Sequence, residues 1–180
     1  MLYHIYFIII IYLFEEVTMI RNAVLDDLPA ILDIYSFARS FMAKTGNPTQ
    51  WADGHPSSEL LREHIHSQKL FVLTDLADGS QIHGCFYFAL ENDLTYAHIK
   101  DGDWLSDSPY GVIHIVASDG TVHGFFRKVL DFCEPQISHL RIDTHHDNKV
   151  MQHVLEKNGF RKCGIIHLAN GDPRLAYEKS

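Results

Sequence analysis

The sequence predicts one α/β domain, built on a single mixed sheet of about six to seven strands with helices on both faces. The chain has 180 residues, 46% hydrophobic and 21% charged, as expected of one globular domain with a full core. Short β-branched apolar runs alternate with stretches whose apolar residues recur at helical spacing. In residues 113–130 such a run passes through Gly120 and Gly124 directly into a helical pattern, which indicates a strand, a glycine turn and a helix.

The first predicted elements are one strand and two helices. Residues 20–24 read as a strand, and the apolar stripe that follows predicts a helix over about residues 28–44. The aspartate pair at 26–27 offers an N-cap for this helix. After a polar loop, the serine pair at 57–58 is expected to cap a second helix, because a serine hydroxyl accepts a hydrogen bond from the first turn.

A hairpin and a long loop come next. The apolar runs at residues 70–75 and 82–90 flank the turn sequence at residues 78–80, which predicts two antiparallel strands. Residues 91–110 carry charged and aromatic side chains without a clear period. We therefore expect these residues to form a loop over one end of the sheet.

The second half of the domain repeats strand and helix and then ends in two strands. After the glycine turn and its helix, the predicted elements are a strand at residues 140–144, a helix at residues 148–158 and strands at residues 161–168 and 175–179. The sequence also specifies how the last helix ends. Gly159 can adopt the left-handed conformation, and Phe160 can then pack back on the helix in a Schellman motif.

Residues 1–18 form an apolar extension before the domain, which we assign to residues 19–180. The apolar stretch is shorter than the about 20 residues of a membrane-spanning helix, and it lacks the basic residues and cleavage site of a signal peptide. Three interpretations stay open, in this order: a segment upstream of a natural start at Met19, an extra strand or helix packed on the domain, and a weak membrane anchor. We expect no stable membrane insertion.

Charge and cysteine content argue against several classes of protein. The 15 Lys and Arg against 23 Asp and Glu give a net charge of −8, whereas nucleic-acid binders usually carry a basic stripe. We therefore expect no nucleic acid partner. Cys85, Cys133 and Cys163 lie in apolar runs without a C-x-x-C pair, so we interpret them as buried hydrophobic side chains. Nothing requires a disulfide, and we expect a cytoplasmic protein.

Two motifs carry a resemblance to a known family. The first, residues 121–126, has Gly124 at a glycine position of the family, with Thr121 where Gln or Arg is usual and Phe126 where a small residue is usual. In the second, residues 148–160, the family pattern is Asn-x-x-Ala-x-x-Leu-Tyr-x-Lys-x-Gly-Phe: Asn148, Lys157, Gly159 and Phe160 match it, whereas Met replaces Ala and Leu155 replaces Tyr. With these motifs the chain from residue 19 onward resembles the GCN5-related N-acetyltransferase (GNAT) superfamily.

The resemblance implies the GNAT fold, with a mostly antiparallel sheet, and acetyl-CoA as the co-substrate. It implies that N–H groups at the helix start bind the diphosphate of the cofactor. The helix dipole favours this negative charge, and Gly124 has no side chain to keep the phosphate away from the backbone. The strand before the turn would pair with the pantetheine amides of the cofactor. Asn148 would contact the cofactor near its pantetheine or thiol end, or would only cap its own helix. The alternative is a glycine turn that merely starts a helix. The expected cofactor contacts are Val116, Ala117, Ser118, Thr121, Val122, His123, Gly124, Phe125, Phe126 and Asn148.

Amine attack on a thioester is helped by a base for the amine proton and an acid for the thiolate. Many relatives use the tyrosine of the second motif as the acid, so the resemblance supplies no acid here. His114 is our first candidate base, because the ordinary pKa of histidine is near 6.5, although a structural role is an equal alternative. His145 or His146 is the second candidate, as acid or base, with Asp143 or Asp147 to orient the ring. Adjacent residues lack the spacing of a zinc motif, so we expect no metal.

The implied acceptor is a primary amine on a small molecule or a peptide. Trp51, Tyr87 and Glu91 come from segments that can line its pocket, although core packing explains Tyr87 and a solvated loop explains the other two. The resemblance also allows a homodimer. A non-catalytic acyl-CoA sensor on the same fold and a histidine-rich metal-binding protein are the competing functions.

Overall fold

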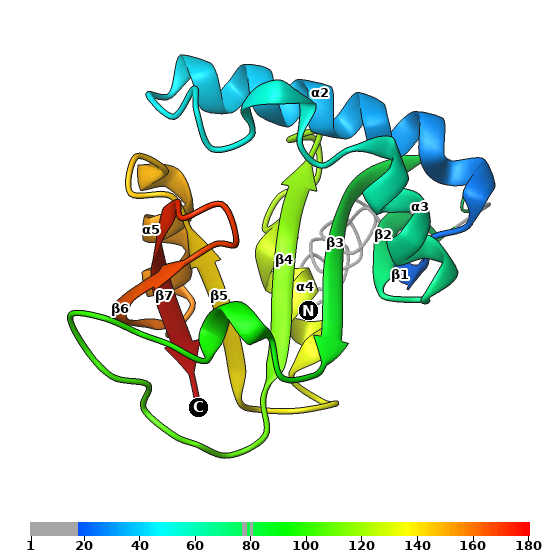
Figure 1. Cartoon of the computed structure of the whole chain (residues 1–180). Coiled ribbons are helices and arrows are strands. Elements are labelled where there is room, and N and C mark those ends of the chain that lie inside the picture. Colours follow the sequence, from blue (N-terminus) through cyan, green and yellow to red (C-terminus); the bar gives the residue numbers. More distant parts are fainter. Residues whose placement is uncertain (1–17, 77–78, 80) are drawn as a thin grey trace, which may run out of the picture.

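The computed structural model describes residues 18–76, 79 and 81–180, and these residues form one seven-stranded mixed sheet with the predicted order of elements (Figure 1). The spatial order of the strands is β1-β2-β3-β4-β5-β7-β6. The β4–β5 pair is parallel and the other pairs in the sheet are antiparallel. The strands are β1 (Thr18–Asn22), β2 (Leu70–Asp75), β3 (Ile82–Leu90), β4 (Gly111–Ser118), β5 (Leu140–Thr144), β6 (Arg161–His167) and β7 (Pro173–Lys179).

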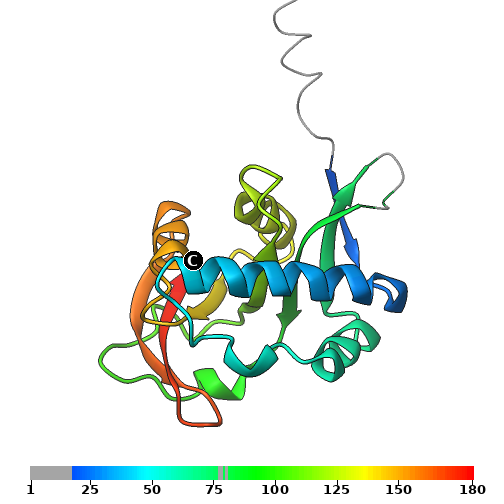
Figure 2. The same ribbon diagram turned by 90° about the horizontal axis from the view of Figure 1, so that it is seen from above.

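Helices and one long segment cover the two faces of the sheet. The main helices are α2 (Leu28–Lys44), α3 (Ser58–His66), α4 (Phe125–Cys133) and α5 (Lys149–Lys157), and short 3-10 turns are η1 (Leu25–Asp27), η2 (Ala52–Gly54) and η3 (Leu94–Tyr96). On one face α4 and α5 share the largest hydrophobic core with the middle strands. On the other face α2 and α3 pack on β2–β4, and residues 91–110 pack on β6 and β7 (Figures 1 and 2).

The predicted helix ends are confirmed at two of three places. The Ser57 hydroxyl accepts a hydrogen bond from Leu60 N–H at 3.2 Å and caps α3. Helix α5 ends in the Schellman pattern: Gly159 has φ 88°, and Phe160 N–H donates to the Leu155 carbonyl at 3.1 Å. At the third place Asp27 is the N-cap residue of α2, as predicted, but its carboxylate makes no capping bond to this helix. It accepts hydrogen bonds from the Arg21 guanidinium at 2.7 and 2.9 Å and from Val24 N–H at 2.8 Å, at the start of η1.

The three cysteines are buried and free, as predicted. Burial raises the pKa of the Cys85 and Cys133 thiols to about 12, which leaves them protonated and unreactive at neutral pH. Their contribution is therefore to packing.

The expected extension at residues 1–18 lies outside the described residues, except for Thr18, which pairs with Asp75 at the start of β1. Its three interpretations stay predictions. Residues 78 and 80 of the hairpin turn also lie outside, but β2 and β3 pair antiparallel as predicted. Within the described residues no helix has the length and apolarity needed to cross a membrane.

Candidate functional site

A cleft opens where β4 and β5 separate. The two strands pair only at Gly111–Leu140 and Val112–Arg141, and beyond these positions they diverge beneath α2 (Figure 1). An open space of about 700 Å³ lies between them, lined by β4, β5, α2, α4 and α5. Because β3 occupies one edge of β4, the other edge is free over most of its length to pair with an extended ligand.

The backbone of β4 is distorted beside this cleft. The register with β3 shifts between Cys85 and Tyr87, where one β3 residue faces two β4 residues, Ile115 and Val116. Ile115 has φ 46°, which is an unfavourable conformation for a β-branched residue. The Tyr35 hydroxyl donates to the Ile115 carbonyl at 2.7 Å and helps to hold the bulge. Bulges and strained residues of this kind are concentrated at functional sites, where they redirect neighbouring groups.

The start of α4 presents unpaired backbone donors to the cleft. Gly124 is the N-cap of α4 with φ 69°, and a Cβ atom added to it would meet nothing within 4 Å. In the part of the chain that the structure describes, no group accepts a hydrogen bond from the N–H of Val122, His123, Gly124 or Phe126. These residues line the cleft, and the positive end of the helix dipole adds to their attraction for an anion.

Nine of the ten expected cofactor contacts line this cleft: Val116, Ala117, Ser118, Val122, His123, Gly124, Phe125, Phe126 and Asn148. The tenth, Thr121, lies outside the lining, and its N–H donates to the Asp119 carboxylate at 2.9 Å. The Phe126 side chain is only 7% exposed and belongs to the core, so its bulk does not obstruct the turn.

Asn148 is the N-cap of α5, as one of its two interpretations predicted. Its Oδ1 accepts a hydrogen bond from Met151 N–H at 3.0 Å, and its Nδ2 donates to Gln50 Oε1 at 3.0 Å. The side chain also lines the cleft, so capping does not exclude a contact with a ligand. The cofactor contact stays a prediction.

His114 lies in the cleft between two carboxylates. Its Nε2 is 2.8 Å from Asp93 Oδ2 and its Nδ1 is 3.4 Å from Asp143 Oδ1, while the Tyr96 hydroxyl donates to that same Asp143 oxygen at 2.9 Å. Burial lowers the pKa of His114, but hydrogen bonds and charges from Asp143 and Asp93 outweigh it and raise the pKa to about 9. Burial likewise opposes the hydrogen bonds of Asp93, whose pKa still falls to about 2. At neutral pH the site therefore holds an imidazolium beside the ionised Asp93.

His145 does not line the cleft with His114 and Asp143. Its Nδ1 accepts a hydrogen bond from Asp147 N–H at 3.2 Å, and its ring packs on His146 with 4.2 Å between centroids. Burial and the charge of His146 lower the pKa of His145. His145, His146 and Asp147 bring one ligand atom each within 4.8 Å of the others, so the expected absence of a metal stays a prediction.

Of the expected acceptor residues, the cleft includes Trp51 but not Tyr87 or Glu91. The Tyr87 hydroxyl donates to the Glu91 carboxylate, which also pairs with Lys69. Tyr87 is 6% exposed, in agreement with core packing, yet its ring centroid lies 5.8 Å from that of His114. Tyr87 therefore packs near His114 but does not itself line the cleft.

The sequence did not predict several residues of the site. Asp93 contacts His114 across 21 residues of chain, and no local pattern reveals that contact. Phe37 and Phe41 on α2 line the cleft although they are 48% and 45% exposed. The sequence could have indicated this exposed pair, because two phenylalanines four residues apart share a helix face outside the buried stripe.

Comparison with known proteins agrees with this geometry. No protein-family model and no curated protein sequence matched the chain. A solved structure of a GNAT-family acetyltransferase from Streptococcus agalactiae 2603 is 30% identical, with a TM-score of 0.79 over 90% of this chain and 94% of that one. A GNAT-family acetyltransferase from Listeria monocytogenes 4b F2365 shares the fold at 16% identity, with a TM-score of 0.63 over 90% of this chain and 94% of that one. On the strength of the first match, this chain belongs to the GNAT family of acetyltransferases.

Proposed function

We propose that this protein transfers the acetyl group of acetyl-CoA to a primary amine of a small molecule or a peptide. The observation that carries the proposal is the cleft between the diverging β4 and β5, with free N–H donors around Gly124 at one end and His114 in its wall. In this proposal the N–H groups from Val122 to Phe126 bind the diphosphate, and the free edge of β4 binds the pantetheine amides.

The transfer joins the amine nitrogen to the carbonyl carbon and breaks the C–S bond, so that coenzyme A leaves as a thiolate. An ammonium acceptor releases two protons, of which one neutralises the thiolate and one passes to solvent. We assign His114 the removal of one proton from the attacking amine and its delivery to the thiolate, while the second proton passes to solvent. The carboxylates of Asp93 and Asp143 attract the ammonium form of the acceptor. With a pKa of about 9, His114 is neutral in about one molecule in 100 at pH 7, so the rate should rise with pH up to about 9.

An assay of free thiol release across a panel of amines tests this proposal. We expect release with at least one primary amine, a pH profile that rises to about 9, and a loss of about 10²-fold or more in kcat for His114→Ala. Acetyl-CoA affinity should be unchanged in this variant, because His114 contacts the acceptor end of the cleft in this proposal. Thiol release by His114→Ala at the wild-type rate and pH profile would remove His114 from the mechanism.

One observation favours a second function, an acyl-CoA sensor that does not turn over. Leu155 occupies the family's tyrosine position and is fully buried, and no tyrosine of the described chain lines the cleft to protonate a thiolate. Calorimetry with acetyl-CoA and the thiol assay together separate the two functions. A sensor binds acetyl-CoA in calorimetry but releases no thiol with any amine of the panel.

A further inference from the structure

The segment of residues 91–110 is attached to the sheet by an arginine of β5. The guanidinium carbon of Arg141 lies 4.0 Å from the ring centroids of both Trp104 and Tyr110, so that the cation is sandwiched between two aromatic rings. Arg141 also donates through Nη2 to the Ser106 carbonyl at 2.6 Å. Its side chain is 6% exposed, and such desolvated cation–π contacts are among the stronger ones.

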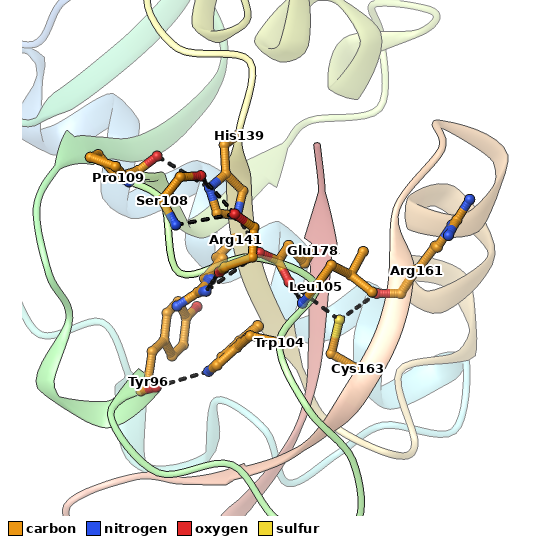
Figure 3. Close-up of polar contacts among 11 residues, drawn as sticks. Tyr96, Trp104, Leu105, Ser108, Pro109, His139, Arg141, Arg161, Cys163 and Glu178 are labelled. Carbon is orange, nitrogen blue, oxygen red and sulfur yellow. Dashed lines mark hydrogen bonds and ion pairs between the residues drawn. The ribbon is translucent and has the colours of Figure 1, made fainter.

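A buried glutamate of β7 completes the attachment. Glu178 is fully buried, and its carboxylate accepts a hydrogen bond from Leu105 N–H at 2.5 Å. The same carboxylate lies 3.4 Å from Arg141 Nη2 and pairs with His139 (Figure 3). Arg141 and Glu178 thus bind the backbone of residues 105 and 106 directly, which fixes this part of the segment.

The same segment carries Asp93 and Tyr96, two of the side chains that surround the cleft histidine. Trp104, which packs on Arg141, donates through Nε1 to the Tyr96 carbonyl at 2.9 Å. The Tyr96 hydroxyl in turn donates to Asp143, and Asp93, three residues before Tyr96, contacts His114. A continuous series of direct contacts therefore connects Arg141 to His114, through Trp104, Tyr96 and Asp143.

Arg141 lies at the point where the cleft begins but does not enter it. It belongs to the last paired position of β4 and β5, Val112–Arg141, and Asp143 follows two residues later on the same strand. Arg141 is absent from the residues that line the cleft in the described chain. Any effect of Arg141 on the reaction must therefore pass through other residues.

We propose that Arg141 is a positioning residue: its sandwich with Trp104 and Tyr110 holds Tyr96 and Asp93 against the Asp143–His114 pair. This inference rests on the proposed function for its catalytic consequence, but the positioning itself exists without turnover. A lysine cannot replace Arg141, because its ammonium group lacks the planar face that stacks between two rings. The ionisable groups that face His114 are Asp93, Asp143, Tyr87, Tyr96 and His64.

The test is Arg141→Lys, with Arg21→Lys as the matched control. Arg21 also makes a two-pronged contact, with Asp27, but it lies on β1 at the edge of the sheet far from β5. Histidine ring NMR of protein with labelled histidines reports the titration of His114 without any need for turnover. We expect the His114 pKa to fall from about 9 by at least about one pH unit in Arg141→Lys, and to stay in place in Arg21→Lys.

If the protein turns over an amine, Arg141→Lys should also lower kcat about tenfold without changing the affinity for acetyl-CoA. Should Arg141→Lys not fold, Trp104→Phe keeps one aromatic ring but removes the Nε1–H donor to Tyr96 and part of the stacking area over Arg141, and the same fall in the His114 pKa is expected. A folded variant of either kind in which His114 titrates as in the wild type overturns the proposal. A protein without turnover in which the His114 pKa falls as expected refutes the proposed function alone.

Discussion

Replacing Gly124 by alanine tests the anion site at the start of α4. Gly124 has φ 69°, a left-handed conformation that is unfavourable for residues with a side chain by roughly 1–2 kcal/mol. A Cβ atom added there meets nothing within 4 Å, so steric overlap inside the protein adds nothing to that strain. Gly124 lines the cleft, so the new methyl group occupies open space next to the free N–H groups of the turn. We therefore expect a small loss of folding stability and a larger loss of cofactor affinity.

The expected loss of cofactor affinity can be calculated from the hydrogen bonds that backbone N–H groups donate to the phosphate. A hydrogen bond to a charged group contributes about 1.5–3 kcal/mol, so that losing one phosphate contact weakens binding by about 10- to 150-fold. Coenzyme A should show this loss in calorimetry with Gly124→Ala. Pantetheine, which has no diphosphate, should bind the variant and the wild type equally.

Gly171→Ala is the matched control for Gly124→Ala. Gly171 has φ 88° and equally open surroundings, but it lies in the turn between β6 and β7, outside the cleft. Both variants should lose about 1 kcal/mol of unfolding free energy in urea titrations, and only Gly124→Ala should lose affinity for coenzyme A. Wild-type affinity for coenzyme A in folded Gly124→Ala would refute the assignment of the diphosphate to this turn.

Three further predictions concern the elements around the cleft. Asn148→Ala should lower the unfolding free energy by about 1 kcal/mol in urea titrations, since α5 loses its cap, and Asn148→Ser should restore most of it. The raised pKa of His114 stabilises the fold below pH 6.5, and the unfolding free energy should lose this contribution as the pH rises through about 9. In His114→Asn, urea titrations at the same pH values should not show this fall in unfolding free energy. Gly84→Ala would bring Cβ within 2.4 Å of the Phe125 ring and 2.8 Å of the Ala117 carbonyl, so thermal unfolding should show a destabilisation of about 1–3 kcal/mol or more. A Gly84→Ala protein as stable as the wild type would contradict the close packing of β3 against α4.

Local features of the fold were readable from the sequence because local chemistry specifies them. The β2 and β3 strands occupy the predicted residues, since their apolar runs are bounded by turn residues. The end of α5 was readable for the same reason, because only glycine enters the left-handed conformation at Gly159 at little energetic cost. The glycine turn before α4 likewise identified the part of the site that depends on backbone donors.

The remaining features depend on contacts between distant parts of the chain. Asp27 satisfied every local rule for a helix cap, yet Arg21 binds its carboxylate in the folded protein. The bulge at Ile115 follows from the register of β3 against β4, which no local pattern of β4 specifies. The pKa of His114 depends on Asp93 and Asp143, so its ordinary value of about 6.5 was the wrong starting point for assigning its protonation state.

The most direct measurement is a crystal structure of the protein with coenzyme A. We expect phosphate oxygens of the diphosphate within about 2.7–3.2 Å of backbone nitrogens between Val122 and Phe126, with pantetheine along the free edge of β4. A diphosphate bound elsewhere, with the turn at Gly124 unchanged and open to solvent, would contradict it.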